Sequence, residues 1–383
     1  MGRDERFEEG PPREVVCPYC FEVFSPWDML FKDKQGQLHP ARRSIGQRII
    51  GGLRHTAPEA VRLPGGEVAK TKVCPNPDCQ HDLPHTAGTQ RELMVGLIGA
   101  SASGKSQYVG SLIPVLQQVV SIDFNCMPLP IDDATEDRYN TEFKRRVAEK
   151  SEVDKTPPYA PPLLYDWAFD DDGDDASEPL RKVTLSLFDR AGEIYSRQDE
   201  ETYRRYLKHA VGVLFILDPT HIPDVRESLP ESTKMPRLDE ITDPATTLAW
   251  VVQQLVTEGR VGSDGKITTP IAVTLSKCDL LRDAHLLDPN SQWSSQHALH
   301  QGQYNLTLHD DVNGMFRTLI RRWSPQAAMT VETRFSTAAY FGVTATGCAS
   351  DERGIYARIA PWRTQDPVLW LLYTLGIIPG RRV

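Results

Sequence analysis

The sequence lacks long hydrophobic runs, internal repeats and an excess of basic residues. No stretch approaches the roughly 18 apolar residues that a membrane helix needs, and the most apolar run, residues 368–378, has the length of a buried helix. The first 16 residues have no apolar core of the kind found in signal peptides. The net charge of −9 argues against a surface that is largely a nucleic-acid footprint. We therefore expect a globular, cytoplasmic protein without a membrane span.

Cysteine is also scarce, with seven residues in a chain of 383, but four of them form two close pairs. Cys17 and Cys20 enclose two residues, Cys74 and Cys79 enclose four, and a proline follows the first cysteine of each pair. In a reducing cytosol this pattern indicates metal binding before disulfide formation. Four thiolates form a closed, tetrahedral Zn²⁺ site, which predicts a structural zinc ribbon.

Two other interpretations of these cysteines are open. The stretch C-P-Y-C also fits a glutaredoxin-like redox motif, which requires a strand-to-helix setting that the following F-E-V-F-S-P-W-D does not offer. Unrelated buried thiols are the third interpretation. Between positions 32 and 62, seven Lys and Arg residues face only two acids, which would suit an acidic partner such as nucleic acid, with an ordinary solvated surface as the competing interpretation.

The chain divides by composition near residues 85–90. Residues 1–90 are rich in Gly, Pro and His and form the predicted zinc-ribbon domain, whereas residues 91–383 alternate apolar strands with helices. This alternation predicts an α/β fold with a mainly parallel sheet covered by helices on both faces. The predicted strands are 92–99, 163–169, 182–189, 211–218, 271–276 and 339–345. The predicted helices are 105–120, 135–150, 197–210, 245–256, 310–323 and a closing helix capped by Asp366.

A phosphate-binding loop joins the first of these strands to the first helix. Residues 99–106 match the pattern G-x-x-x-x-G-K-[ST], in which backbone N–H groups and a helix N-terminus surround a phosphate. Lys105 is expected to reach the β- and γ-phosphates, and the Ser106 hydroxyl to bind Mg²⁺. The predicted phosphate contacts are Gly99, Ser103, Gly104, Lys105, Ser106 and Gln107.

Two later motifs supply the other groups that such a loop needs. Asp189 ends a strand and is expected to hold Mg²⁺ through water, and Gly192 follows it with an N–H for the γ-phosphate. Residues 276–279 read S-K-C-D after a buried strand. Asp279 can accept two hydrogen bonds from guanine while the Lys277 stem lies along the base. Adenine lacks those donors, so the motif favours guanine.

In their order and setting, these three motifs resemble those of the translation-factor-related (TRAFAC) class of GTPases with a Ras-like fold. Ser276 departs from the Asn or Thr of that pattern, and the resemblance assigns Thr344 and Ala345 to its fifth motif, with Ser336-Thr337 as the competing placement. The cysteine pairs, the long insertions and the closing D-P-x-x-W-L-L helix resemble, more narrowly, the bacterial double-GTPase group associated with conflict systems.

The resemblance implies a Mg²⁺-dependent switch that binds GTP or GDP and cleaves the γ-phosphate. Thr156 matches the switch threonine better than Thr135 or Thr141, which lie in a predicted helix, and a plain threonine before prolines is the competing interpretation. Glu193 would orient the attacking water, although its charge repels the γ-phosphate and would slow hydrolysis. The zinc ribbon would dock a protein partner. The alternatives are a nucleotide-binding scaffold with little hydrolysis and an ATP-using enzyme whose ribbon binds nucleic acid.

Overall fold

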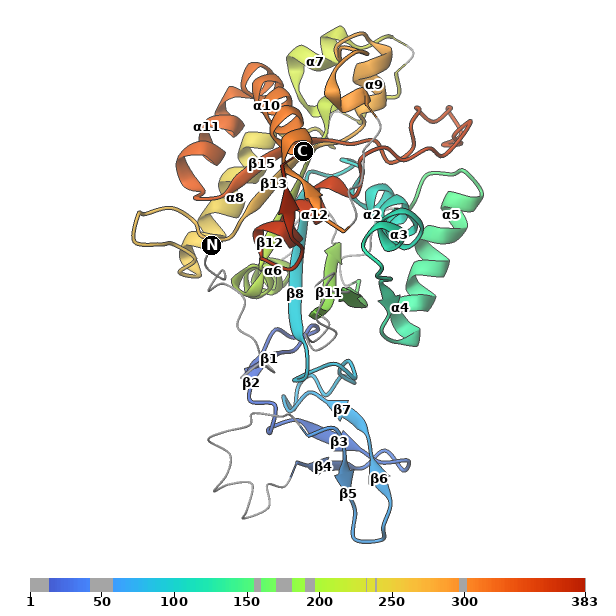
Figure 1. The fold of residues 1–383 in the computed structure, drawn as a ribbon, viewed down its shortest axis with the longest axis vertical. Coiled ribbons are helices and arrows are strands. Elements are labelled where there is room, and N and C mark those ends of the chain that lie inside the picture. Colours follow the sequence, from blue (N-terminus) through green and yellow to red (C-terminus); the bar gives the residue numbers. More distant parts are fainter. Residues whose placement is uncertain are drawn as a thin grey trace.

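The computed structural model describes residues 14–41, 58–154, 160–169, 181–189, 197–231, 233–237, 240–295 and 302–382. An N-terminal part of short strands lies at one end of the molecule, and the long strand β8 (Arg91–Gly99) leads from it into a larger α/β part (Figure 1). None of the helices within these ranges combines the length and the apolar character that crossing a membrane requires.

The α/β part is built on a seven-stranded sheet with the order β15-β13-β12-β8-β11-β10-β9. Its strands after β8 are β9 (Leu129–Pro130), β10 (Leu163–Phe169), β11 (Arg181–Asp189), β12 (Gly212–Leu217), β13 (Ile271–Leu275) and β15 (Ala338–Gly342). The five strands from β15 to β11 are parallel, and β10 pairs with β11 in antiparallel register. The strand order reverses around β8, and the crevice beyond the carboxyl end of a strand at such a point is where parallel sheets bind ligands.

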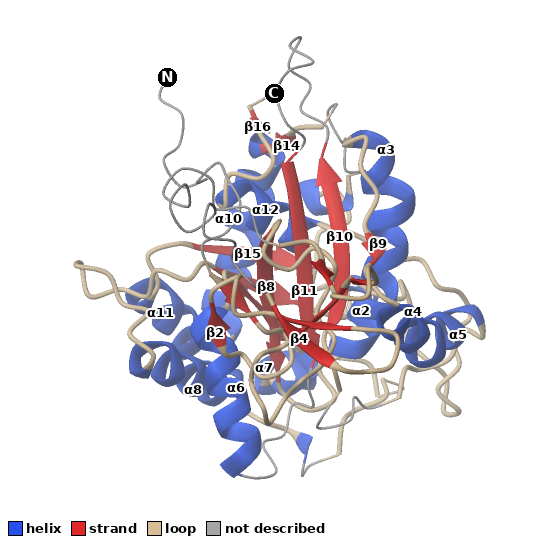
Figure 2. Cartoon of the chain, turned by 90° about the horizontal axis from the view of Figure 1, so that it is seen from below, coloured by secondary structure: helices blue, strands red, loops and turns tan. Residues whose placement is uncertain are grey.

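Helices cover both faces of this sheet (Figure 2). They are α2 (Lys105–Val115), η1 (Leu116–Val120), α3 (Ser121–Asp123), α4 (Asp133–Arg138), η2 (Tyr139–Lys144), α5 (Arg145–Ala148), α6 (Arg197–His209), η3 (Pro219–His221), α7 (Pro223–Ser228), α8 (Pro244–Thr257), α9 (Cys278–Asp283), η5 (Gln292–Ser294), α10 (Leu306–Trp323), α11 (Pro325–Arg334) and α12 (Asp366–Thr374). Two further short strands, β14 (Tyr304–Asn305) and β16 (Gly380–Arg381), pair with each other.

Successive side chains of β8 point to opposite faces of the sheet, and each face packs against a different set of helices. Leu93, Val95 and Leu97 pack in one core with α2 and α12, whereas Met94 and Ile98 pack in the other with α6, α8, α10 and α11. A strand that is buried on both sides reads as a continuous apolar run, because neither face meets water. The predicted fold class, a mainly parallel sheet between helices, is confirmed.

The predicted strands and helices correspond to observed elements, but the predicted 135–150 helix is divided into α4, η2 and α5, and the short helices α7 and α9 were not predicted. The predicted 105–120 helix contains Pro114, and the carbonyl of Gly110 that Pro114 cannot bond accepts a hydrogen bond from the Tyr139 hydroxyl at 3.3 Å. Helix α11 was not predicted. Asp366 was wrongly predicted as a cap: it lies inside α12, and its carboxylate accepts a bond from Arg363 at 2.8 Å.

The N-terminal part consists of very short strands around a small core of its own. They are β1 (Val15–Val16), β2 (Val23–Phe24), β3 (Leu30–Lys32), β4 (Leu38–Pro40), β5 (Val61–Arg62), β6 (Val68–Ala69) and β7 (Thr71–Val73). Phe21 leaves this small core and joins the α/β core instead, with its ring edge-on to Phe188 at 5.4 Å and to Tyr206 at 5.5 Å. The two parts therefore share an aromatic cluster.

A cavity of about 160 Å³ is lined by residues of both parts. Glu92 lines the cavity, and its Oε1 is buried without a hydrogen-bond partner among the described residues, although the residue as a whole is only half-buried. Burial raises the pKa of the Glu92 carboxyl to about 8. A carboxyl whose pKa is higher in the folded chain binds its proton more tightly there than in the unfolded chain.

The free energy of unfolding should therefore fall as the pH rises from about 4.5 to about 8, by up to ~1.4 kcal/mol per pH unit for this one group. Glu92→Gln should remove that part of the pH dependence, while Asp224→Asn, at an exposed position on α7, should leave it unchanged. Urea unfolding at pH 5, 6, 7 and 8 measures the slopes. Equal slopes for Glu92→Gln and the wild type would contradict the assignment.

Candidate functional site

The conformation of the loop between β8 and α2 depends on a close backbone approach at Gly99 and on left-handed backbones at Ala102 and Gly104. A Cβ on Gly99 would lie 2.5 Å from the carbonyl oxygen of Ile216, so the loop can leave the sheet here only with glycine. Ala102 and Gly104 both adopt left-handed backbone conformations, with φ of 57° and 86°. Such turns direct successive N–H groups into one concavity, which is an anion-binding geometry. Gly104 is also the N-cap of α2, where the helix dipole adds to the same effect.

Lys105 begins α2 and is buried beneath this loop. Its ammonium donates to the carbonyl oxygens of Gly99 at 2.9 Å and Ala100 at 2.8 Å. Ser106 and Gln107 follow in the first turn, and the Gln107 side chain accepts a hydrogen bond from the N–H of Val153 at 3.1 Å. The predicted phosphate contacts thus lie together at the carboxyl end of the central strand.

The segment 276–279 holds the phosphate loop from the side of β13. The Ser276 hydroxyl donates to the carbonyl oxygen of Ser103 at 3.0 Å, and the Lys277 ammonium donates to that of Ala102 at 3.2 Å. Lys277 has a left-handed backbone, φ 50°, which turns the chain from β13 into α9. The serine that departs from the family pattern therefore bonds the loop backbone through its hydroxyl.

Asp279 lies in the first turn of α9 and is buried. Its Oδ1 accepts a hydrogen bond of 2.5 Å from the Thr344 hydroxyl, which in turn accepts from the N–H of Gly347 at 2.8 Å. Burial raises the pKa of the Asp279 carboxyl, and the bond from Thr344 opposes that rise. Ala345 is tied to α2, since its carbonyl accepts from the Ser111 hydroxyl at 2.7 Å.

The competing placement of the fifth motif lies elsewhere. Ser336 and Thr337 precede β15, whereas Thr344 and Ala345 follow it. The Ser336 hydroxyl donates to the carbonyl oxygen of Ile267 at 2.9 Å, which anchors it near the amino end of the sheet. Of the two candidate pairs, Thr344-Ala345 is the one that the fold brings to Asp279.

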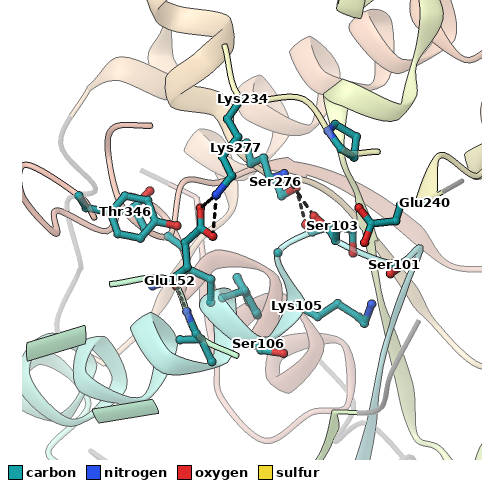
Figure 3. A pocket seen from close by; sticks show the side chains of 18 of the residues that line it. Ser101, Ser103, Lys105, Ser106, Glu152, Lys234, Glu240, Ser276, Lys277 and Thr346 are labelled. Atoms are coloured by element: carbon teal, nitrogen blue, oxygen red, sulfur yellow. Dashed lines mark hydrogen bonds and ion pairs between the residues drawn. The ribbon is translucent and has the colours of Figure 1, made fainter. Parts of the chain in front are cut away.

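A cavity of about 470 Å³ lies between these motifs (Figure 3). It has the size of a small-molecule binding site. Its lining consists of residues 101–108, residues 152–154, residues 234–237, Glu240, Ser276, Lys277, Asp279, Val343, Ala345, Thr346 and Tyr356. Gly99 and Thr344 support this lining without forming part of it. One cavity therefore joins the phosphate loop to the predicted base-binding carboxylate.

The remaining predicted site residues lie partly or wholly outside the described part of the chain. Asp189 is the last residue of β11, where its backbone pairs with Leu97 of β8, but its side chain is not described. Thr156, Gly192 and Glu193 fall outside the described residues. Their roles stay predictions.

Several lining or supporting residues were not found from the sequence. Asp218 directly follows β12, is fully buried, and forms a 2.6 Å ion pair with the Lys277 ammonium, which fixes the Lys277 side chain. The proximity of that ammonium holds the pKa of the Asp218 carboxyl below its usual value despite its burial. The sequence did contain a signal for Asp218, because it is an acidic residue directly after an apolar strand. Glu152, Lys234 and Tyr356 lie in aperiodic segments that carry no such signal.

The four N-terminal cysteines meet at a second candidate site. Their sulfur atoms all lie within 4.8 Å of one another, with Cys17 and Cys79 3.8 Å apart and Cys20 and Cys74 3.8 Å apart. A tetrahedral Zn²⁺ with Zn–S bonds of about 2.3 Å requires sulfur atoms about 3.8 Å apart. A disulfide would need about 2.05 Å. The donor set therefore fits a closed metal site.

Local hydrogen bonds form the two turns that carry these cysteines. Cys17 and Cys20 lie between the paired strands β1 and β2, and the Phe21 N–H donates to the Cys17 carbonyl at 2.9 Å. Cys79 donates its N–H to the Asn76 carbonyl at 3.0 Å in the second turn. No helix follows Cys20 directly, so the first turn lacks the strand-to-helix setting of a redox motif.

Three comparisons with known proteins gave matches. A family model described as Double-GTPase 2 matches residues 93–310, which is more than half of the chain. A protein of Mycolicibacterium smegmatis that is provisionally described as the ESX-1 scaffolding and assembly protein SaeC is 24% identical over 414 residues, covering 94% of this chain and 99% of that protein. A solved structure, the Arl6 BBS3 small GTPase from Trypanosoma brucei with bound GppNp, covers 74% of this chain and 98% of its own at 11% identity and a TM-score of 0.29.

The family match spans both the phosphate loop and the segment 276–279, the two motifs that the fold joins in one cavity. The chain therefore belongs to the Double-GTPase 2 family of P-loop GTPases.

Proposed function

We propose that the 470 Å³ cavity binds GTP and GDP and that the protein hydrolyses GTP slowly. The observation that carries the proposal is that the phosphate loop with Lys105 and the carboxylate of Asp279 line one cavity. The loop amides and the Lys105 ammonium would hold the β- and γ-phosphates. Asp279 would accept hydrogen bonds from the guanine ring, and the Lys277 stem would lie along the base.

The residues present also fit a magnesium ion, because hydroxyl and carboxylate oxygens are its preferred ligands. Ser106, Asp189 and Thr156 would hold it, and Mg²⁺ would neutralise charge on the β- and γ-phosphates. Glu193 would orient the attacking water, and Gly192 would donate its N–H to the γ-phosphate. Catalysis in this proposal consists of positioning and charge stabilisation, without a covalent intermediate.

We further propose that the protein acts in the cytoplasm and binds a protein partner that distinguishes its GTP-bound from its GDP-bound state. The N-terminal part, with Zn²⁺ bound, would be the module that docks this partner. The support is the 24% identical relative, whose description names scaffolding and assembly. That relative also favours the second candidate function, a nucleotide-binding scaffold with little hydrolysis. In either case the affinity for the partner should differ between the GTP-loaded and GDP-loaded protein.

Lys105→Ala separates the hydrolase from the scaffold. Its ammonium would stabilise charge that develops on the phosphates, so its loss should lower GTP hydrolysis by about 10²-fold. Phosphate release under multiple turnover with excess GTP and Mg²⁺ measures this, with Lys208→Ala on the exposed face of α6 as the matched control. Phosphate release that is equal in the wild type and in Lys105→Ala would remove the hydrolase and leave the scaffold.

A further inference from the structure

Three segments that none of the nucleotide motifs includes meet at Glu152. They are residues 150–154, residues 233–237 and residues 346–358. The Lys234 ammonium binds both carboxylate oxygens of Glu152, at 2.7 and 2.9 Å. The Ser350 hydroxyl donates to the same carboxylate at 2.5 Å. Glu152 thus joins chain segments separated by about 80 and about 200 residues of sequence.

The backbone strengthens this junction. The N–H of Glu152 donates to the carbonyl oxygen of Gly354 at 2.9 Å, and the N–H of Tyr356 donates to that of Lys150 at 2.7 Å. Gly354 has a left-handed φ of 76°, and a Cβ there would lie 3.2 Å from a Glu152 carboxylate oxygen. A side chain at position 354 would therefore be strained by the left-handed backbone and would crowd the Glu152 carboxylate.

The junction forms a wall of the nucleotide cavity. Glu152, Lys234 and Tyr356 all line the cavity. The N–H of Val153 bonds the Gln107 side chain, which ties the junction to the first turn of α2. Figure 3 shows the Lys234 side chain extended to the Glu152 carboxylate, at the side of the view opposite Lys105.

Tyr356 places this wall near the base-binding end. Burial raises the pKa of the Tyr356 hydroxyl, and the negative charges of Glu152 and Asp279 raise it further, so Tyr356 lies within electrostatic reach of both carboxylates. The segment 346–358 also begins directly after Ala345, and the N–H of Gly347 donates at 2.8 Å to the Thr344 hydroxyl that bonds Asp279. This wall therefore continues from the end of the cavity that holds Asp279.

We propose that Glu152 and Lys234 form a clasp that retains the bound nucleotide at its purine-ribose end and must open for nucleotide exchange. This inference rests on the proposed nucleotide binding. Glu152 acts as a positioning residue: through Lys234 and Ser350 it holds the wall against the cavity. The pair is partly exposed, with 41% and 48% of the Glu152 and Lys234 side chains accessible, so a modest effect on release is expected.

The test is displacement of N-methylanthraniloyl-GDP from the full chain by excess unlabelled GDP in stopped flow. Glu152→Gln and Lys234→Met should each raise the dissociation rate about two- to fivefold. The double variant should release no faster than the faster single variant, because both changes open one contact. The thermal midpoint should stay within about 2 °C of the wild type, which a merely structural role would not predict.

Arg145→Met is the matched control. Arg145 forms an ion pair of 2.9 Å with Glu149 on α5 that does not line the cavity, so its loss should leave release unchanged. If the wild type binds the labelled GDP and the Glu152 and Lys234 variants release it at the wild-type rate, the clasp is wrong while the proposed function stands. If the wild type binds no guanine nucleotide, the proposed function fails, and this inference fails with it.

Discussion

Removing the Zn²⁺ that we propose for the four-cysteine cluster is expected to unfold the N-terminal part of the protein while the α/β part stays folded. The core of the N-terminal part contains only eight buried apolar residues within the described chain, and two of these are Cys17 and Cys74. Its strands are two or three residues long, which is too short to be stable alone. Structural Zn²⁺ binds with about 10–16 kcal/mol, more than such a core supplies.

Metal analysis and limited proteolysis measure this effect. We expect about one Zn²⁺ per chain, and after chelation rapid cleavage within residues 14–41 and 58–84 with protection of residues 91–154. Cys20→Ser should reproduce the chelated pattern, whereas Cys348→Ser, outside the cluster, should retain the metal. Loss of the fold around Cys17 should also release Phe21 from Phe188 and Tyr206, which would expose an aromatic surface on the α/β part. A metal-free protein that resists proteolysis within residues 14–41 and 58–84 would contradict the metal site.

Asp279→Asn is expected to lower GTP affinity by at least about 100-fold. Guanine would donate two hydrogen bonds to this carboxylate, and the amide of asparagine would face one of these donors with a donor of its own. Sites built on buried polar pairs discriminate by several kcal/mol when one partner is lost. Because burial raises the pKa of the Asp279 carboxyl, the variant should not unfold more easily than the wild type.

Asp283→Asn provides the control for that variant. Asp283 lies on the same helix, α9, but is exposed and pairs with Arg282 at 3.0 Å. The Asp283→Asn variant loses the same charge as Asp279→Asn, but Asp283 does not line the cavity. Equilibrium titration with fluorescent GTP and circular dichroism of both variants test the comparison. Equal GTP affinity for the two variants would show that Asp279 does not contact the base.

Local sequence patterns were sufficient for the elements that carry the chemistry. Strand β8 and the phosphate loop were readable because β-branched apolar residues, two glycines and a lysine each have a local physical meaning. The two cysteine turns were readable for the same reason. The pairing of Cys17 with Cys79 and of Cys20 with Cys74 was not, because spacing does not determine how two turns face each other.

The clasp could not be predicted from the sequence. Glu152 and Lys234 lie in segments without hydrophobic periodicity, and an acid and a base 82 residues apart carry no sign of their contact. Asp366 shows the opposite error. Asp-Pro before an apolar run is a regular helix start, but the Arg363 guanidinium provides a stronger, buried partner for the carboxylate than a helix N–H would.

Competition between GTP and ATP for a labelled guanine nucleotide tests the central claim most directly. The claim is that one cavity holds a triphosphate at Lys105 and selects the purine ring at Asp279. We predict that unlabelled GTP displaces the label at least about 100-fold more effectively than ATP, since adenine would leave the Asp279 carboxylate unpaired. Equal displacement by both nucleotides, or no binding of the label, would contradict the claim.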